Sequence, residues 1–221
     1  MNSELQTLNL KLKVCGLTQK DQADELISMN TDFLGFIFYE KSLRYVLNHL
    51  SLDDISKIDH QGKAGVFVNG EINTIIETAE KANLNFIQLH GDENTAFVSE
   101  LRKKLRPETG IIKVIRIGNQ KPEVINQIEK IISQQLSAIS FLLFDTDSKA
   151  FGGTGKQFDW SILNAFEIPL PYFLSGGISE ENIEKIKILK HKPFALDINS
   201  RFETVPGNKN IDKIRQFKSF L

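Results

Sequence analysis

The stretch SFLLFDTDSKAFGGTGKQFDW, residues 140–160, joins an apolar run, a carboxylate, a glycine-rich loop and the start of a new periodic segment. Asp145 follows the apolar run, so if that run is a buried strand, the carboxylate lies where the strand leaves the core. The glycines at 152–155 suit a loop that closes over a ligand. An ordinary turn with an aspartate that caps a helix has the same composition, so this stretch alone leaves both interpretations open.

Apolar runs of this kind recur along the chain and alternate with segments that have helical spacing. Strands separated by helices run parallel, because each helix returns the chain to the same end of the sheet. Eight such units in 221 residues predict a single domain over 1–221, a (β/α)8 TIM barrel with eight parallel strands. The alternative is an open doubly wound sheet, whose glycine fingerprint is missing from CGLT at 15–18. The expected strands are residues 10–15, 33–38, 64–68, 85–90, 111–117, 140–145, 171–175 and 193–198.

Stripes of apolar residues mark the expected helices between these strands. Thr18 is the predicted N-cap of the first helix, and Ser179 begins the segment after the seventh strand. The stripes lie at residues 23–27, 52–58, 72–79, 97–105, 124–132, 158–166, 182–189 and 211–221.

The bulk composition excludes several classes of protein. A formal net charge of −1, without a long basic run, argues against a nucleic-acid partner. Cys15 is the only cysteine, so no disulfide forms within the chain, as is typical of a reducing compartment. The amino terminus has no sustained apolar stretch, which argues against a signal peptide or a membrane anchor. We expect a cytoplasmic protein, either a monomer or a homodimer.

The ends of the predicted strands carry an acid and a base. In such a barrel the site is built at the carboxyl ends of the strands, where Cys15 ends the first and Asp145 the sixth. A thiol and a carboxyl group that face one ligand can act as base and acid. The base must be a thiolate, so its surroundings should favour the anion, through Gly16 and the following helix start. A small buried hydrophobe is the alternative role for Cys15.

Two other strand ends suit a phosphate. Gly176 and Gly177 follow the seventh strand and let backbone N–H groups approach an anion, and Asn199 and Ser200 follow the eighth. An ordinary glycine turn is the alternative. His90 ends the fourth strand and is a further candidate for contact with the substrate. The four histidines lie on separate segments without ligand spacing, so we expect no metal.

Lys13 lies two residues before Cys15 and points the same way in a strand. A charge inside a barrel needs a partner, and Asp197 on the eighth strand neighbours the first strand once the barrel closes. We therefore expect a structural Lys13–Asp197 pair, with a catalytic lysine as the alternative.

Seven short motifs occur in order along nearly the whole chain, and together they resemble the phosphoribosylanthranilate isomerase family of tryptophan biosynthesis. Each motif is weak alone, but the ordered set is specific. The motifs are KVCGLT at 13–18, GFIF at 35–38 with SLRYV at 42–46, GVFVN at 65–69, QLHGDE at 88–93, LFD at 143–145 with GGTG at 152–155, LSGGI at 174–178 and LDINS at 196–200.

The resemblance implies an Amadori rearrangement of N-(5-phosphoribosyl)anthranilate, a small phosphorylated substrate, without metal or organic cofactor. It implies Cys15 as general base and Asp145 as general acid, and Arg44 as the clamp for the anthranilate carboxylate, which a guanidinium fork suits. The phosphate is then held by the glycine pair after the seventh strand and by Asn199 and Ser200.

Two departures from the family pattern fall near this site. Leu43 replaces a usual proline beside Arg44, and Arg201 replaces a usual glycine after Ser200, adding a cation to the phosphate loop. A lyase barrel such as indole-glycerol-phosphate synthase is the nearest enzymatic alternative, but its strand-end lysine and glutamate are missing here apart from Lys13. A phosphate-binding barrel without activity is the other alternative.

Overall fold

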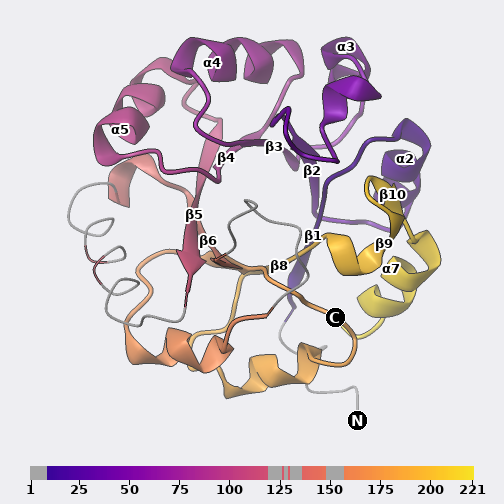
Figure 1. The fold of residues 1–221 in the computed structure, drawn as a ribbon, viewed down its shortest axis with the longest axis vertical. Helices are drawn as coiled ribbons and strands as arrows, with labels where there is room; N and C mark the ends of the chain where they lie inside the picture. The colour runs from indigo at the N-terminus through magenta and orange to yellow at the C-terminus, as the bar shows by residue number, and fades with distance from the viewer. Residues whose placement is uncertain (1–8, 119–125, 127–128, 130–135, 148–156) are drawn as a thin grey trace.

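Eight parallel strands form a closed barrel in the order β1 to β8, with β8 hydrogen-bonded back to β1. The structure is a computed structural model that describes residues 9–118, 126, 129, 136–147 and 157–221. Helices surround the ring of strands, as the view down the short axis shows (Figure 1). The predicted (β/α)8 barrel is confirmed, and the open sheet is wrong. The strands are β1 Lys11–Cys15, β2 Phe33–Ile37, β3 Lys63–Phe67, β4 Phe86–Leu89, β5 Gly110–Ile117, β6 Phe141–Thr146, β7 Tyr172–Leu174 and β8 Ala195–Ile198.

The outer helices begin where the apolar stripes predicted, except after β6 and β7. There the segments are short 3-10 helices, and the second begins four residues after Ser179, with Asn182 at its N-cap. The stripe at 124–132 and the glycine loop at 152–155 lie outside the described residues, apart from residues 126 and 129. The helices are α2 Lys20–Ser28, α3 Leu52–Ser56, α4 Ile72–Lys81, α5 Thr95–Lys104 and α7 Ile211–Lys218, with 3-10 segments η1 Val46–Asn48, η2 Leu136–Ala138, η3 Trp160–Ala165, η4 Ile183–Ile188 and η5 Ser200–Phe202.

The cap of the first helix differs from the prediction. Gln19, not Thr18, precedes α2, and its side chain makes no capping hydrogen bond. The hydroxyl of Thr18 instead donates to the carbonyl of Gly207 at 2.7 Å, in the segment that follows β8. As an N-cap, Thr18 would accept a hydrogen bond from an N–H group in the first turn of α2. Here it donates to a backbone carbonyl far along the chain instead.

Two hydrophobic layers hold the barrel together. The larger layer lies between the strands and the helices, because alternate strand residues point outward. The smaller layer fills the barrel interior and is rich in phenylalanine, with edge-to-face contact between Phe33 and Phe173 at 5.0 Å. The interior layer consists of Phe33, Ile112, Val114, Leu143, Phe173 and Ala195.

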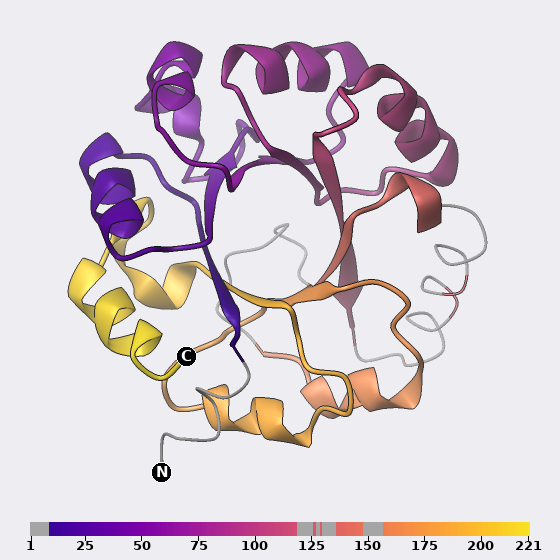
Figure 2. The same cartoon turned by 180° about the vertical axis from the view of Figure 1, so that it is seen from behind.

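A two-stranded hairpin follows β8 and was not predicted. It consists of β9 Glu203–Val205 and β10 Asn208–Lys209, which pair antiparallel. α7 follows the hairpin and packs beside α2, so the two ends of the ring of helices meet (Figures 1 and 2). The hairpin thereby lies at the mouth of the barrel, next to the end of β1.

Candidate active site at the carboxyl ends of the strands

Cys15 ends β1, and the residue is 5% exposed. Gly35 pairs with it on β2, and a Cβ added there would lie 2.8 Å from the sulfur, so the glycine makes room for the thiol. Burial raises the pKa of the Cys15 thiol above its ordinary value, and the ammonium groups of Lys13 and Lys209 oppose this only in part. Burial therefore favours the neutral thiol over the thiolate.

The prediction that Gly16 and the following helix start favour the thiolate is wrong. The N–H groups of Gly16 and Leu17 both donate to the carbonyl of Gly35, at 2.9 and 3.0 Å. α2 begins only at Lys20. The groups that stabilise a thiolate here are the two buried lysines, which the backbone pattern around residue 15 did not indicate.

Asp145 lies next to the end of β6 and is buried, as predicted for a strand exit. Its Oδ1 accepts from the N–H of Thr146 at 2.8 Å, and its Oδ2 lies 3.4 Å from Nε2 of His90, just after β4. The amide nitrogen of Gln88 lies 3.3 Å from Nδ1 of His90. When that amide donates to Nδ1, the ring proton is on Nε2, the nitrogen that lies nearer to Asp145.

Lys13 and Asp197 form the predicted ion pair inside the barrel. Nζ of Lys13 lies 3.0 and 2.9 Å from the two carboxylate oxygens, and both side chains are buried. Burial opposes the charge of Lys13, but Asp197 and Cys15 raise its pKa above the ordinary value. Asp197 is also within electrostatic reach of Asp145 and His90. This paired lysine fits the structural role better than the catalytic one.

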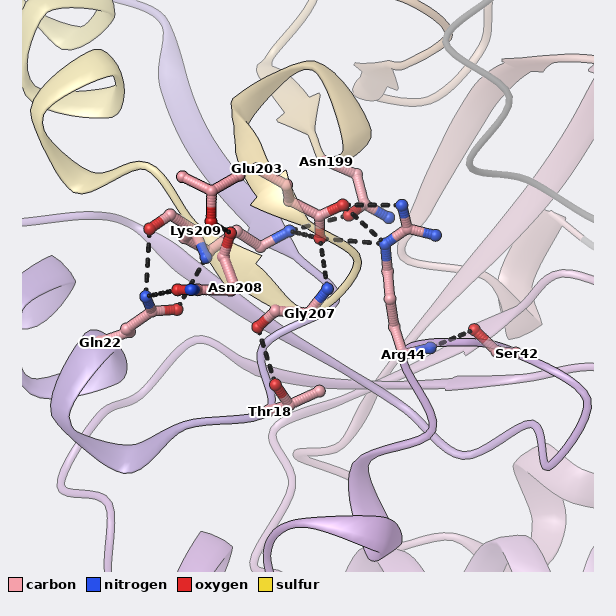
Figure 3. Close-up of polar contacts among 10 residues, drawn as sticks. Thr18, Gln22, Ser42, Arg44, Asn199, Glu203, Gly207, Asn208 and Lys209 are labelled. Carbon is pink, nitrogen blue, oxygen red and sulfur yellow. Dashed lines mark hydrogen bonds and ion pairs between the residues drawn. The ribbon is translucent and has the colours of Figure 1, made fainter.

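Arg44 follows β2 and reaches the same mouth, but another side chain occupies part of its fork. Its Nε and Nη2 atoms donate to the carboxylate of Glu203, at 2.7–3.0 Å. A Cβ added at Gly16 would lie 2.7 Å from Cδ of Arg44 and 2.8 Å from Oδ1 of Asn199. Arg44 and Asn199 therefore both pack on Gly16, the residue that follows Cys15. Figure 3 shows the two side chains together with Glu203.

The predicted phosphate residues lie on two neighbouring loops after β7 and β8. Gly176 and Gly177 both have positive φ, +85° and +69°, a conformation that favours glycine. Their N–H groups make no backbone hydrogen bond within the described part of the chain, and neither does that of Ser200. Free N–H groups on adjacent loops suit an anion. The glycines do not start a helix directly, because η4 begins at Ile183.

Three residues of the mouth were missed in the sequence: Gln88, Glu203 and Lys209. Gln88 contacts His90, and the other two contact Arg44 and Asn199. The segment VPGNK at 205–209 has the Pro-Gly-Asn composition of a hairpin turn, which could have indicated β9 and β10. Nothing in the local pattern marks Lys209 as buried, since its partners come from other segments.

The described residues show neither a metal-binding cluster nor a membrane-spanning helix. Within residues 9–118, 136–147 and 157–221, no three His, Cys, Asp or Glu side chains are grouped to hold a metal ion. No helix in the described chain has the length and apolar character needed to cross a membrane.

The chain is similar to known isomerases over nearly its whole length. The family profile described as N-(5'phosphoribosyl)anthranilate (PRA) isomerase matches residues 12–219. A curated relative from Parabacteroides distasonis, named N-(5'-phosphoribosyl)anthranilate isomerase, is 36% identical over 93% of this chain and 90% of its own.

Solved structures give the same result. The phosphoribosyl anthranilate isomerase of Thermotoga maritima superposes with a TM-score of 0.78 at 30% identity, covering 96% of this chain and 98% of that one. A second, bound to reduced 1-(O-carboxyphenylamino)-1-deoxyribulose 5-phosphate, has a TM-score of 0.71 at 29% identity, covering 94% and 96%. With its closed barrel and its acid and thiol at the strand ends, this chain belongs to the N-(5'-phosphoribosyl)anthranilate isomerase family.

Proposed function

We propose that Cys15 and Asp145 catalyse the rearrangement of N-(5-phosphoribosyl)anthranilate to 1-(2-carboxyphenylamino)-1-deoxyribulose 5-phosphate, the isomerisation of this family in tryptophan biosynthesis. The observation that carries the proposal is the shared mouth. Cys15 is the last residue of β1 and Asp145 the last but one of β6, so both lie at the carboxyl end of the closed barrel. The buried Lys13–Asp197 pair lies within electrostatic reach of both. A base on β1 and an acid on β6 thus share the barrel mouth.

The reaction needs one acid and one base in sequence. The carboxyl group of Asp145 gives its proton to the ring oxygen of the ribose, the bond between that oxygen and C1 breaks, and the nitrogen lone pair forms the imine. The thiol proton of Cys15 passes to solvent, and the resulting thiolate removes the proton on C2, so that those electrons form the enolamine. A proton added at C1 and the loss of the C2 hydroxyl proton give the ketone, so no external oxidant or reductant is needed.

The buried lysines address the main difficulty of this scheme, which is that burial favours the neutral thiol. Lys13 and Lys209 each lower the pKa of Cys15 against the effect of burial. Two cations near a developing thiolate stabilise it without any movement of the protein. We infer that these two side chains, rather than the backbone after Cys15, support the base.

The remaining predicted residues bind the two ends of the substrate. Gly176, Gly177 and Ser200 offer N–H groups for the phosphate. Asn199, predicted beside them, packs against the same glycine as Arg44, so we assign its amide to the carboxylate end instead. At the other end Arg44 receives the anthranilate carboxylate. Nε2 of His90 lies 3.4 Å from Oδ2 of Asp145, close enough to orient the acid.

The test follows the loss of anthranilate-type fluorescence when the protein meets freshly made substrate. Cys15→Ala and Asp145→Asn should each lower kcat by about 100-fold or more, because each removes one proton-transfer group. Glu77→Gln, which alters an exposed ion pair on α4, is the matched control and should not change the rate. Decay no faster than without protein, with inorganic phosphate still bound, would leave only a binding barrel.

A further inference from the structure

The hairpin β9–β10 sends two charged side chains back toward the barrel mouth. It is fixed in place by α2, since the amide of Gln22 donates to Lys209 O at 3.0 Å and accepts from Lys209 N at 2.8 Å. In Figure 3, Gln22 lies on one side of the hairpin and Arg44 on the other, with Glu203 and Lys209 between them. The hairpin therefore connects the helix layer to the candidate site.

Glu203 and Lys209 are the centre of a buried polar cluster. Nζ of Lys209 lies 2.7 Å from Oε1 of Glu203 and 2.8 Å from Oδ1 of Asn199. The Glu203 side chain is 3% exposed, that of Lys209 is fully buried, and that of Arg44 is 11% exposed. Glu203 is held rigidly, because its carboxylate accepts from both Arg44 and Lys209.

The charges of this cluster do not balance. Arg44 and Lys209 bring two positive charges, and Glu203 is the only carboxylate that either contacts within the described residues. Burial opposes the charge of Glu203, but hydrogen bonds from Arg44 and Lys209 hold its pKa below the ordinary value. Burial lowers the pKa of Lys209, and Arg44 adds to that effect. An excess buried cation is costly, and an anion from a ligand removes that cost.

The nitrogen donors of Arg44 and Asn199 that Glu203 and Lys209 do not contact indicate where that anion binds. Glu203 accepts from Nε and Nη2 of Arg44, and Nη1 makes no hydrogen bond or ion pair with the described residues. Lys209 takes the oxygen of the Asn199 amide, so the amide nitrogen is turned away from it. In Figure 3 the Arg44 guanidinium and the Asn199 amide lie on the side of the hairpin away from Gln22, and both side chains pack against Gly16. Neighbouring donors on a fixed frame suit a carboxylate.

We propose that Glu203 and Lys209 are positioning residues for the carboxylate of the substrate. Glu203 binds Nε and Nη2 of Arg44 and leaves Nη1 for the carboxylate. Lys209 donates to both Glu203 and Asn199 and so fixes their positions. The cluster keeps one positive charge, which the substrate carboxylate balances. The inference rests on the proposed role of Arg44 as carboxylate clamp, and adds the two residues that act through it.

A double-mutant cycle tests this inference. Glu203→Gln should raise KM about 10-fold and leave kcat within about twofold, since the loss of a charged hydrogen bond weakens binding of substrate and transition state alike. In an Arg44→Ala background the same change should raise KM by less than about twofold, because its effect passes through Arg44. Glu77→Gln is again the control, and urea unfolding confirms that each variant is folded.

A substrate analogue separates positioning from general damage. Phosphoribosylaniline lacks the carboxylate, so its KM should be the same for the parent and for Glu203→Gln. The KM of Lys209→Arg, which keeps the charge, should be closer to the parent KM than the KM of Lys209→Met is. Full additivity in the cycle, or equal KM effects on both substrates, would assign Glu203 a structural role and overturn the inference. If Arg44→Ala itself leaves KM unchanged, the proposed clamp fails instead.

Discussion

Nζ of Lys13 lies 2.9 Å from Oδ2 of Asp197, and this buried pair joins β1 to β8 where the ring of strands closes. Lys13→Met removes one partner and leaves a carboxylate alone in the barrel interior. We expect the free energy of unfolding to fall by about 3–5 kcal/mol. Urea unfolding of the parent and the variant, followed by circular dichroism, measures the difference.

The matched control for this change is the double variant Lys13→Met with Asp197→Leu. It removes both charges, so most of the lost stability should return. The pH dependence gives a second check. Because the pKa of Lys13 is raised in the folded state, the stabilisation it provides is complete below the ordinary lysine value of 10.5 and is lost as the pH rises through the folded pKa. An equally unstable double variant would contradict the pairing argument.

Cys15 is the only cysteine, so its ionisation can be followed without interference. Burial raises the pKa of its thiol, so alkylation by iodoacetamide should be slow at neutral pH and should accelerate as the pH rises past the ordinary range of a free thiol. Lys209→Met should move this profile to still higher pH, since it removes a cation that lowers the thiol pKa. The rate against pH is the measurement, with Cys15→Ser as the blank. Rapid alkylation at neutral pH would show that the thiolate is already present.

Gly176, in the predicted phosphate loop after β7, packs closely against Asp145 and Thr146 at the end of β6. A Cβ added there would lie 2.4 Å from Oγ1 of Thr146 and 3.3 Å from Oδ1 of Asp145, and its φ is +85°. Gly176→Ala should cost about 1–2 kcal/mol of stability, because a left-handed conformation disfavours an L side chain. It should also lower kcat about 100-fold, since displacing a catalytic group by about 1 Å has an effect of that size.

Gly70→Ala is the control for this prediction. A Cβ there would approach Ile75 no closer than 3.4 Å, an ordinary contact, and its φ is not positive. Steady-state kinetics and thermal unfolding of both variants separate the loss of activity from the loss of stability. A fully active Gly176→Ala variant would show that the loop tolerates movement beside Asp145.

The order of strands and helices, the ion pair inside the barrel and most strand-end residues could be predicted from the sequence. Apolar runs and helical stripes are local patterns, and parallel strands with crossovers leave few topologies, so Lys13 and Asp197 became neighbours by closure alone. The same logic placed Cys15, His90 and Asp145 at one end of the barrel. The motif likeness supplied their roles, which remain proposals.

The tertiary structure alone decided how these groups are charged and held. The sequence could not show that the N–H groups after Cys15 are used by Gly35, or that burial outweighs two lysines at the thiol. Nor could it place Glu203 and Lys209 against Arg44, 159 residues away from Glu203 along the chain. Hydrogen-bond partners and desolvation depend on distances between remote segments, whereas periodicity depends only on neighbours.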